Sequence, residues 1–280
     1  NMLNMLENFD LGTIGWNSSD YVHLLTEVER RAYADRSEHL GDPDFWNIPI
    51  SMLTSKEYAK NRMKTFSKEK ATLSTDISAS KKIYNESIET THYSVVDKLG
   101  NAVSVTTTIN LNYGSGIIVE GAGFFLNNEM DDFSSKPGVP NVFGLIGNEA
   151  NAIEPNKRPL SSMTPTIILK DDKPFMVIGS PGGSTIITTT LQNILNVIEF
   201  NMDIEEAVSS PRFHSQWLPD VIQIEPRSLP KDVLINLKEK GHQVVPYRWG
   251  YIGEANGILI LKDGFYGGGD NRGETSAIGY

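Results

Sequence analysis

A tight turn between two strand-like runs constrains this chain more than any other feature. Residues 90–97 and 102–108 alternate as β-strands do, and Lys98-Leu99-Gly100 lies between them. A three-residue hairpin loop usually ends in the left-handed backbone region, which glycine adopts without a steric penalty. The turn therefore predicts an antiparallel hairpin in which Thr90, at the start of the first strand, lies opposite Thr108.

Two interpretations of this threonine pair are open. Cross-strand Thr–Thr pairs are common in β-sheets, and the pair can be purely structural. Alternatively, Thr90 is an N-terminal nucleophile that becomes exposed when the bond after Glu89 is cut. A free α-amine has a pKa near ~8, so it can take the proton of its own hydroxyl without a histidine. Thr108 would then orient the Thr90 oxygen, and the site would need an oxyanion hole, a substrate clamp and a mobile linker before the cut.

Composition narrows the classes of partner. The chain has 280 residues, a formal net charge of −10 and no cysteine. This length suits one large or two modest domains, and the negative charge argues against nucleic acid and anionic membranes as partners. Without cysteine there are no disulfides or thiolate metal sites. His214 and Trp217 are expected to be packing residues because no second histidine lies at metal spacing. We expect no metal and no cofactor.

Helical patterns and a polar linker precede the hairpin. Residues 1–9 form an amphipathic pattern with no start signal, so we expect further chain before Asn1. Ser18 is expected to cap a helix that runs through His39 and carries solvated or salt-bridged arginines. Residues 67–89 are rich in Ser, Lys and Glu and predict a mobile linker that ends at the proposed cut.

Three segments after the hairpin are candidates for the rest of a site. Residues 127–133 include several carboxylates, which suit acid–base catalysis, a cation site or a surface turn. Residues 137–144 form a loop rich in Pro and Gly, which is a plausible lid. Residues 179–184 form a Gly-Gly turn between a strand and a helix, a geometry that suits an oxyanion hole. The absence of a P-loop lysine argues against a phosphate site, and taken alone the turn is interpreted as structural.

The remaining pattern predicts an α+β fold. The helix after the Gly-Gly turn is expected to bury one face, made of Ile187, Leu191, Ile194, Leu195 and Ile198. Strands near 243–245, 257–261 and 265–266 are expected to complete one sheet.

These motifs resemble the γ-glutamyltransferases (γ-glutamyl transpeptidases), a family of N-terminal nucleophile hydrolases. The resemblance is carried, in order, by Thr90–Asp97, Asn127–Phe133, Lys136–Asn141, Asn156–Met163 and Gly179–Ser184. It implies a four-layer αββα sandwich, incomplete at the N-terminus. Residues 1–89 would be the end of the large subunit and residues 90–280 the whole small, catalytic subunit.

The resemblance also implies roles for individual residues. Thr90 would be the nucleophile for cleavage after Glu89 and for acyl transfer, supported by Thr108. The substrate α-amino group would be held by Asn110, Glu129 and Asp132, its α-carboxylate by Ser161 and Ser162, and the oxyanion by Gly182 and Gly183. Phe143 stands in the lid where the family commonly has a gating tyrosine, and the family's carboxylate-binding arginine would lie before Asn1.

The implied function is an autoprocessing γ-glutamyltransferase and hydrolase. Glutathione and other γ-glutamyl compounds would donate the acyl group, and water, amino acids or peptides would accept it. The small subunit would pair with the remainder of the large subunit, and the family implies a periplasmic or secreted protein. The alternatives are a related acyl-transfer enzyme, such as a poly-γ-glutamate depolymerase or cephalosporin acylase, or a catalytically silent fragment.

Overall fold

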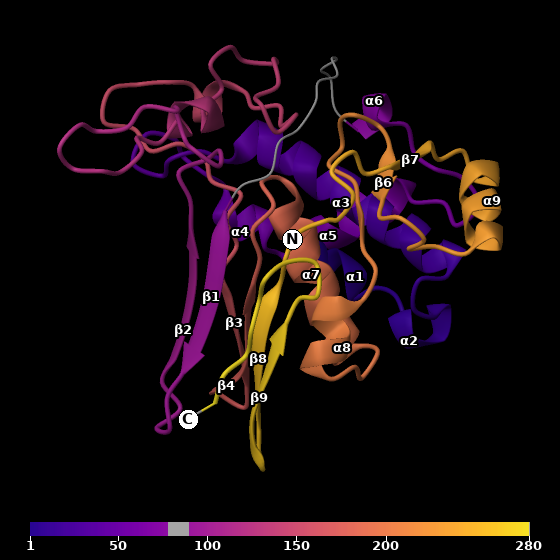
Figure 1. The fold of residues 1–280 in the computed structure, drawn as a ribbon. Helices are drawn as coiled ribbons and strands as arrows, with labels where there is room; N and C mark the ends of the chain where they lie inside the picture. The colour runs from indigo at the N-terminus through magenta and orange to yellow at the C-terminus, as the bar shows by residue number, and fades with distance from the viewer. Residues whose placement is uncertain (78–89, 280) are drawn as a thin grey trace. The chain divides into compact units, whose positions relative to one another are not determined.

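The computed structural model describes residues 1–77 and 90–279, which fall into two compact units. Unit 1 comprises Asn1–Glu86, Glu129–Ser161 and Phe213–Arg248, and unit 2 comprises Ser87–Asn128, Ser162–Arg212 and Trp249–Tyr280. Figure 1 colours the chain by residue number, so the three stretches of each unit can be followed. The predicted division into residues 1–89 and 90–280 is a division by cleavage of the chain, which these compact units do not test, so it stays a prediction.

Unit 2 contains the predicted hairpin. Strand β1 (Thr91–Val96) pairs with β2 (Ala102–Thr107) in an antiparallel register that joins Val96 to Ala102 and Thr91 to Thr107. Gly100 has φ +84°, the left-handed conformation that the loop requires. The predicted register is therefore confirmed, and one further step along it places Thr90 opposite Thr108.

A four-stranded sheet forms the centre of unit 2. Its order is β3 (Thr166–Lys170), β4 (Lys173–Gly179), β8 (Asn256–Leu261) and β9 (Gly264–Gly269), with antiparallel neighbours throughout. The expectation that the strand near 243–245 joins this sheet is wrong. That strand, β7 (Val244–Pro246), instead lies parallel to β6 (Ile222–Ile224) in a separate sheet of unit 1. Strand patterns define each strand but not its neighbour, so sequence alone did not separate the two sheets.

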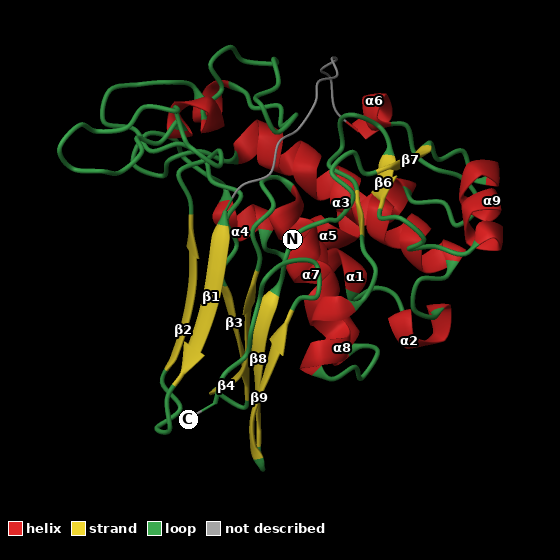
Figure 2. Ribbon diagram, viewed as in Figure 1, coloured by secondary structure: helices red, strands yellow, loops and turns green. Residues whose placement is uncertain are grey.

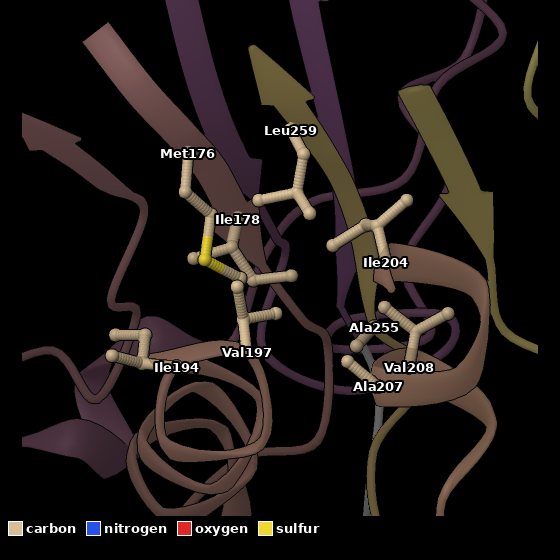
Figure 3. Close-up of a cluster of buried hydrophobic side chains, with 9 residues drawn as sticks. All are labelled: Met176, Ile178, Ile194, Val197, Ile204, Ala207, Val208, Ala255 and Leu259. Carbon is tan, nitrogen blue, oxygen red and sulfur yellow. The ribbon is translucent and has the colours of Figure 1, made fainter. Parts of the chain in front are cut away.

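Two helices cover one face of the four-stranded sheet, α7 (Thr185–Ile198) and α8 (Ile204–Ser209). Figure 3 shows the apolar side chains that pack between these helices and the sheet, from Met176, Ile178, Ile194, Val197, Ile204, Ala207, Val208, Ala255 and Leu259. Full burial of a Val, Leu, Ile or Met side chain contributes about 1.5–3 kcal/mol. The predicted single apolar face of α7 is only partly correct, because Ile198 is 47% exposed whereas Thr188 and Asn193 are fully buried.

The β1–β2 hairpin packs on the other face of the sheet, against β4 and β8 (Figure 2). The buried ring of His92 lies directly over the Cα of Gly179, where any Cβ would overlap it. Nδ1 of His92 lies 2.8 Å from Thr106 Oγ1, which fixes the ring in this position. Helices, sheet and hairpin are thus stacked in order within unit 2. The α+β class is confirmed.

Unit 1 is mainly helical. Its longest helix, α3 (Ser19–His39), begins where Ser18 Oγ accepts the Tyr21 N–H at 3.1 Å, as the capping signal predicts. The remaining elements are α1 (Met2–Leu6), α2 (Leu11–Ile14), α4 (Ile50–Leu53), α5 (Lys56–Arg62), η1 (Met63–Thr65), α6 (Ser74–Ile77), η2 (Glu129–Asp132), η3 (Glu149–Asn151), β5 (Phe213–His214), β6 (Ile222–Ile224), α9 (Lys231–Glu239) and β7. Among the described helices, none is both long and apolar enough to cross a bilayer.

Several charged residues of α3 are buried rather than solvated. Arg30 and Arg31 are 2% and 1% exposed, and both bind the carboxylate of Glu27 one turn earlier. Arg30 also binds Asp220 at 2.7 Å. Salt bridging was anticipated for these arginines, but their burial was not. Removing one partner of such a buried group costs about 3–5 kcal/mol, because it leaves an uncompensated charge.

The first part of the expected linker is attached to this charged group. The N–H of Thr72 donates to Glu27 at 3.0 Å, and the N–H of Ser74 donates to Asp220 at 2.8 Å. The indole of Trp217 donates to the Ser74 carbonyl at 3.0 Å. Residues 78–89, with Glu89 and the proposed scissile bond, lie outside the described residues.

A chain of hydrogen bonds joins two buried histidines in unit 1. His23 Nε2 lies 2.7 Å from the Ser67 carbonyl oxygen, which only accepts, so Nε2 carries the hydrogen. Nδ1 of His23 is then the acceptor for Nε2 of His242, 2.6 Å away. The imidazole of His23 is therefore neutral. Burial, and then the positive charge of Arg30, lower the pKa of His242 to about 3.

We predict that His242 makes unit 1 sensitive to acid. The unfolded chain binds a proton at this histidine below about 6.5 and the folded chain does not, so its stabilising effect is complete above that pH and is lost as the pH falls. In His242→Gln, an amide donor can replace Nε2 without titrating. The free energy of unfolding of the wild type relative to this variant should fall by about 1.4 kcal/mol per pH unit below 6.5.

Urea denaturation of both proteins between pH 7.5 and 4.5 measures this difference. The difference between the wild type and the variant is measured because buried carboxyls with raised pKa values, such as Asp132, change the free energy of unfolding with pH in the opposite direction. Their contribution is the same in both proteins and cancels in the difference. A pH-independent difference would contradict the prediction.

Candidate functional site

Thr90 lines a cavity in unit 2. The cavity has a volume of about 1200 Å³ and is lined by β1, by Pro181, by β8 and β9, and by residues 274–279. Thr90 is half-buried and directly precedes β1, so the strand fixes its backbone. Thr108 follows β2, and its Oγ1 accepts the N–H of Asn110 at 2.9 Å. The hairpin thus brings the predicted nucleophile and its supporting threonine to the same end of the two strands.

The Gly-Gly turn has a conformation that requires glycine. Gly182 and Gly183 have φ +136° and +56°, both in the region that other residues rarely adopt. Their carbonyl oxygens accept the N–H groups of Thr185 and Ile186 in the first turn of α7. Within the described chain, neither glycine N–H donates a hydrogen bond. Two donors at the N-terminus of a buried helix are well suited to a developing negative charge.

The other predicted contacts of unit 2 are only partly assembled within it. Asn110 is 2% exposed with φ +75°, and its side-chain amide donates to the Asn128 carbonyl at 3.1 Å. Ser162 is half-buried in unit 2, whereas Ser161 is exposed and ends a stretch of unit 1. The boundary between the units therefore falls inside the predicted carboxylate clamp. Each residue is placed here within its own unit.

Glu129 and Asp132 form a carboxyl pair in unit 1, at the two ends of η2. Burial, and then the nearby charge of Glu129, raise the pKa of Asp132 to about 7, although Arg36 opposes the shift. Burial also raises the pKa of Glu129. With a pKa of about 7, Asp132 is only partly ionised near neutral pH. A group of this kind attracts a cation such as an ammonium ion. Arg36 was expected to be solvated or salt-bridged, and no sequence signal indicated that its charge reaches Asp132.

The predicted lid is an ordered turn of unit 1. Pro140 and Ile146 form an antiparallel bridge, and the side-chain oxygen of Asn141 accepts the N–H groups of Phe143 and Leu145. Phe143 is 5% exposed, and its carbonyl oxygen accepts from Gln216 at 3.1 Å. The loop thus has a defined conformation around a buried Phe143.

Among the residues that the structure describes, one further group has the side chains of a metal site. His23, Glu27 and His242 are buried close together in unit 1. The oxygens of Glu27 already accept from Arg30, Arg31 and Thr72, and the facing histidine nitrogens share a hydrogen. The nearby guanidinium groups also repel a cation. This donor set does not fit a metal ion. As expected, His214 and Trp217 are packing residues, 0% and 2% exposed.

We predict that Glu129→Gln lowers the pKa of Asp132 from about 7, because it removes a like charge while the burial remains. Asp131→Asn is the matched control. Asp131 also raises this pKa but is the weakest contributor, so its removal should have a smaller effect. Carboxyl ¹³C NMR titration of the variants measures both shifts. Equal shifts in the two variants, or none, would show that Glu129 is not the dominant charge.

Comparison with known proteins places this geometry in a family. The family model of gamma-glutamyltranspeptidase matches residues 1–280. The glutathione hydrolase proenzyme of Escherichia coli (strain K12) is 51% identical over 272 residues, which cover 97% of this chain and 46% of that protein. The chain therefore spans about half the length of this relative.

Solved structures of similar proteins support the same family. A mutant gamma-glutamyltranspeptidase of Helicobacter pylori is 60% identical with a TM-score of 0.63, over 65% of this chain and 100% of that chain. A cephalosporin acylase from Bacillus halodurans, 24% identical with a TM-score of 0.79 over 97% of this chain and 46% of that chain, shares the fold. The match along the whole chain and the identity to these relatives show that the chain belongs to the gamma-glutamyltranspeptidase family.

Proposed function

We propose that this chain carries the catalytic part of a glutathione hydrolase and γ-glutamyltransferase that cuts itself between Glu89 and Thr90. The observation that supports this best is the position of Thr90, at the head of β1, opposite Thr108 in register and at the lining of a large cavity. The relative from Escherichia coli is a glutathione hydrolase proenzyme. A solved relative, 60% identical, is described as a gamma-glutamyltranspeptidase in which the C-terminus has critical roles in autoprocessing and catalysis.

Self-cleavage requires only groups of this chain and water. The Thr90 hydroxyl oxygen attacks the Glu89 carbonyl carbon, and the C–N bond breaks as the nitrogen takes a proton. The resulting ester is opened by water, which leaves a carboxylate on Glu89 and a free α-amine on Thr90. That amine then serves as the base for the Thr90 hydroxyl in later turnovers.

In turnover, the Thr90 oxygen attacks the γ-carbonyl of the donor and expels its amine, which leaves with a proton. Water or an amine acceptor then takes the γ-glutamyl group from the ester. The N–H groups of Gly182 and Gly183 would stabilise the oxyanion in both steps. Thr108 would orient the Thr90 oxygen, and Phe143 would belong to the lid.

The substrate's charged end would be held by two further groups. Glu129 and Asp132, with Asn110, would bind the α-ammonium group, and Ser161 and Ser162 the α-carboxylate. The raised pKa of Asp132 supports this assignment, because an ammonium ion would supply the positive charge that the buried carboxyl pair lacks. It also favours γ-glutamyl donors over the acyl groups of a cephalosporin acylase. We propose the remainder of a large subunit as the partner and the periplasm or cell exterior as the location.

We predict that Thr90→Ala in the full-length protein leaves the bond after Glu89 intact and abolishes release of p-nitroaniline from γ-glutamyl-p-nitroanilide. The matched control is Thr91→Ala, which removes an exposed hydroxyl from the adjacent residue and should leave cleavage intact. Intact-mass spectrometry detects the new N-terminus at Thr90. Cleavage at this bond in the Thr90→Ala precursor would refute the proposed nucleophile.

We predict that Asp132→Asn lowers kcat/KM about tenfold to a hundredfold for donors with a free α-amine. The loss of a charge-assisted hydrogen bond corresponds to roughly 1.5–3 kcal/mol. Donors whose amine is acetylated should be poor substrates of the wild type and should lose little further activity in the variant. Steady-state kinetics on both donor types measures the effect. Equal turnover of the two donor types by the wild type would contradict the assignment.

A further inference from the structure

The loop from Ser180 to Gly183 is held on one side by α7. Thr185 Oγ1 donates to the Gly182 carbonyl oxygen at 2.8 Å, and the Thr185 N–H donates to the same oxygen at 3.0 Å. A Cβ at Gly182 would lie 2.5 Å from Thr185 Oγ1. These contacts fix the Gly182 carbonyl relative to α7. They leave the start of the loop, at Ser180, to be held by something else.

A second segment holds the loop from the opposite side. Ser180 is fully buried, and its Oγ accepts the N–H of Glu254 at 2.9 Å and donates to the Pro181 carbonyl oxygen at 2.6 Å. A Cβ on Gly182 would come within 3.3 Å of the Gly253 Cα, so the two backbones are in close contact. The Ser180 hydroxyl is thus the hydrogen-bonded link between the loop and this segment.

Gly253 is required for this contact. Its φ is +66°, and a Cβ there would lie 2.7 Å from Ser180 Oγ and 2.6 Å from Thr189 Oγ1. Both distances are too short for a real contact. A side chain at position 253 would therefore push directly on the serine hydroxyl.

The supporting segment is itself rigid. Arg212 and Asp270 form a buried ion pair with an N–O distance of 2.6 Å. Arg212 also donates to the Ile252 carbonyl at 2.8 Å, and Asp270 accepts the Ala255 N–H at 2.7 Å. Ile252 and Ala255, which flank Gly253–Glu254, are therefore both hydrogen-bonded to the same ion pair. The Glu254 N–H is presented to Ser180 from an anchored backbone.

We propose that Ser180 is a positioning residue for the oxyanion loop, and that Gly253 is the position through which the segment before β8 supports it. This inference rests on the proposed function of Gly182 and Gly183. Donors stabilise an oxyanion only at about 2.7–3.1 Å, and a site loses activity when its supporting contacts allow small displacements. Ser180 acts through the loop, so its effect should appear in the transition state and not in substrate binding.

The test uses the full-length protein and γ-glutamyl-p-nitroanilide. Ser180→Ala should lower kcat roughly tenfold to a hundredfold, somewhat less than the loss of an oxyanion donor itself, with KM within about twofold. Affinity for a boronic acid analogue of the γ-glutamyl group, which forms a tetrahedral adduct, should fall by the same factor. Affinity for the product glutamate should not change.

Thr188→Val is the matched control. Thr188 is also fully buried, lies on α7 and donates its hydroxyl to the Thr185 carbonyl at 3.1 Å. Its loss should lower Tm to an extent similar to Ser180→Ala but leave kcat near that of the wild type. Equal losses of kcat in both variants would indicate general destabilisation and overturn the proposal.

A second pair of variants covers the case in which Ser180→Ala does not mature. Ser180→Thr and Ser180→Val have the same shape and differ only in the hydroxyl group. The threonine variant should cut itself and turn over donor faster than the valine variant, and equal behaviour of the two would overturn the proposal. An inactive wild type would instead refute the proposed function. Wild-type activity with an unaffected Ser180→Ala would refute this inference alone.

Discussion

The register of the β1–β2 hairpin is the constraint on which the chemistry of unit 2 depends. Successive residues of a strand point to opposite faces, so a slip of one residue would turn every side chain of β1 to the other side. The turn ending at Gly100 prevents such a slip. The same register that places Thr90 opposite Thr108 also directs His92 towards β4. One turn at the far end of the hairpin therefore sets the position of the candidate nucleophile.

Glu27 and Asp132, two carboxyl groups of unit 1, differ in how far neighbouring groups compensate their negative charge. Glu27 is fully buried, but two arginines and Thr72 use both of its oxygens. The hydrogen bonds to both oxygens make Glu27 a structural charge rather than a binding group. Asp132 has only Arg36 to oppose its burial and lies beside a second carboxyl. Its charge is incompletely compensated by the described protein, which is the condition for recognising a cationic ligand.

Local signals predicted much of the fold. Ser18 caps the helix that it was expected to begin, because capping depends on a few adjacent residues. Gly100 predicted a register, because a short loop leaves few alternatives. Those predictions needed no knowledge of distant parts of the chain.

What sequence did not predict depends on contacts between distant segments. Arg30 is buried because Asp220, 190 residues away, binds it. β7 pairs with β6, a choice that its own pattern does not encode. Most of α7 is buried, including Thr188 and Asn193, so polarity alone predicted only part of the buried surface of this helix. For the candidate site, the motifs indicated which residues to examine, but the raised pKa of Asp132 depends on its burial and on the placement of Glu129 and Arg36, which the order of residues does not reveal.

The contact between His92 and Gly179 has an evolutionary consequence. The imidazole occupies the space in which any side chain at position 179 would begin, so the two positions cannot vary independently. Gly179 ends β4 immediately before the Gly-Gly loop, and His92 is two residues after Thr90. A lineage that replaced Gly179 would first have to accept a smaller residue at position 92, and so disturb the strand that carries the nucleophile. Substitutions at positions 92 and 179 therefore depend on each other.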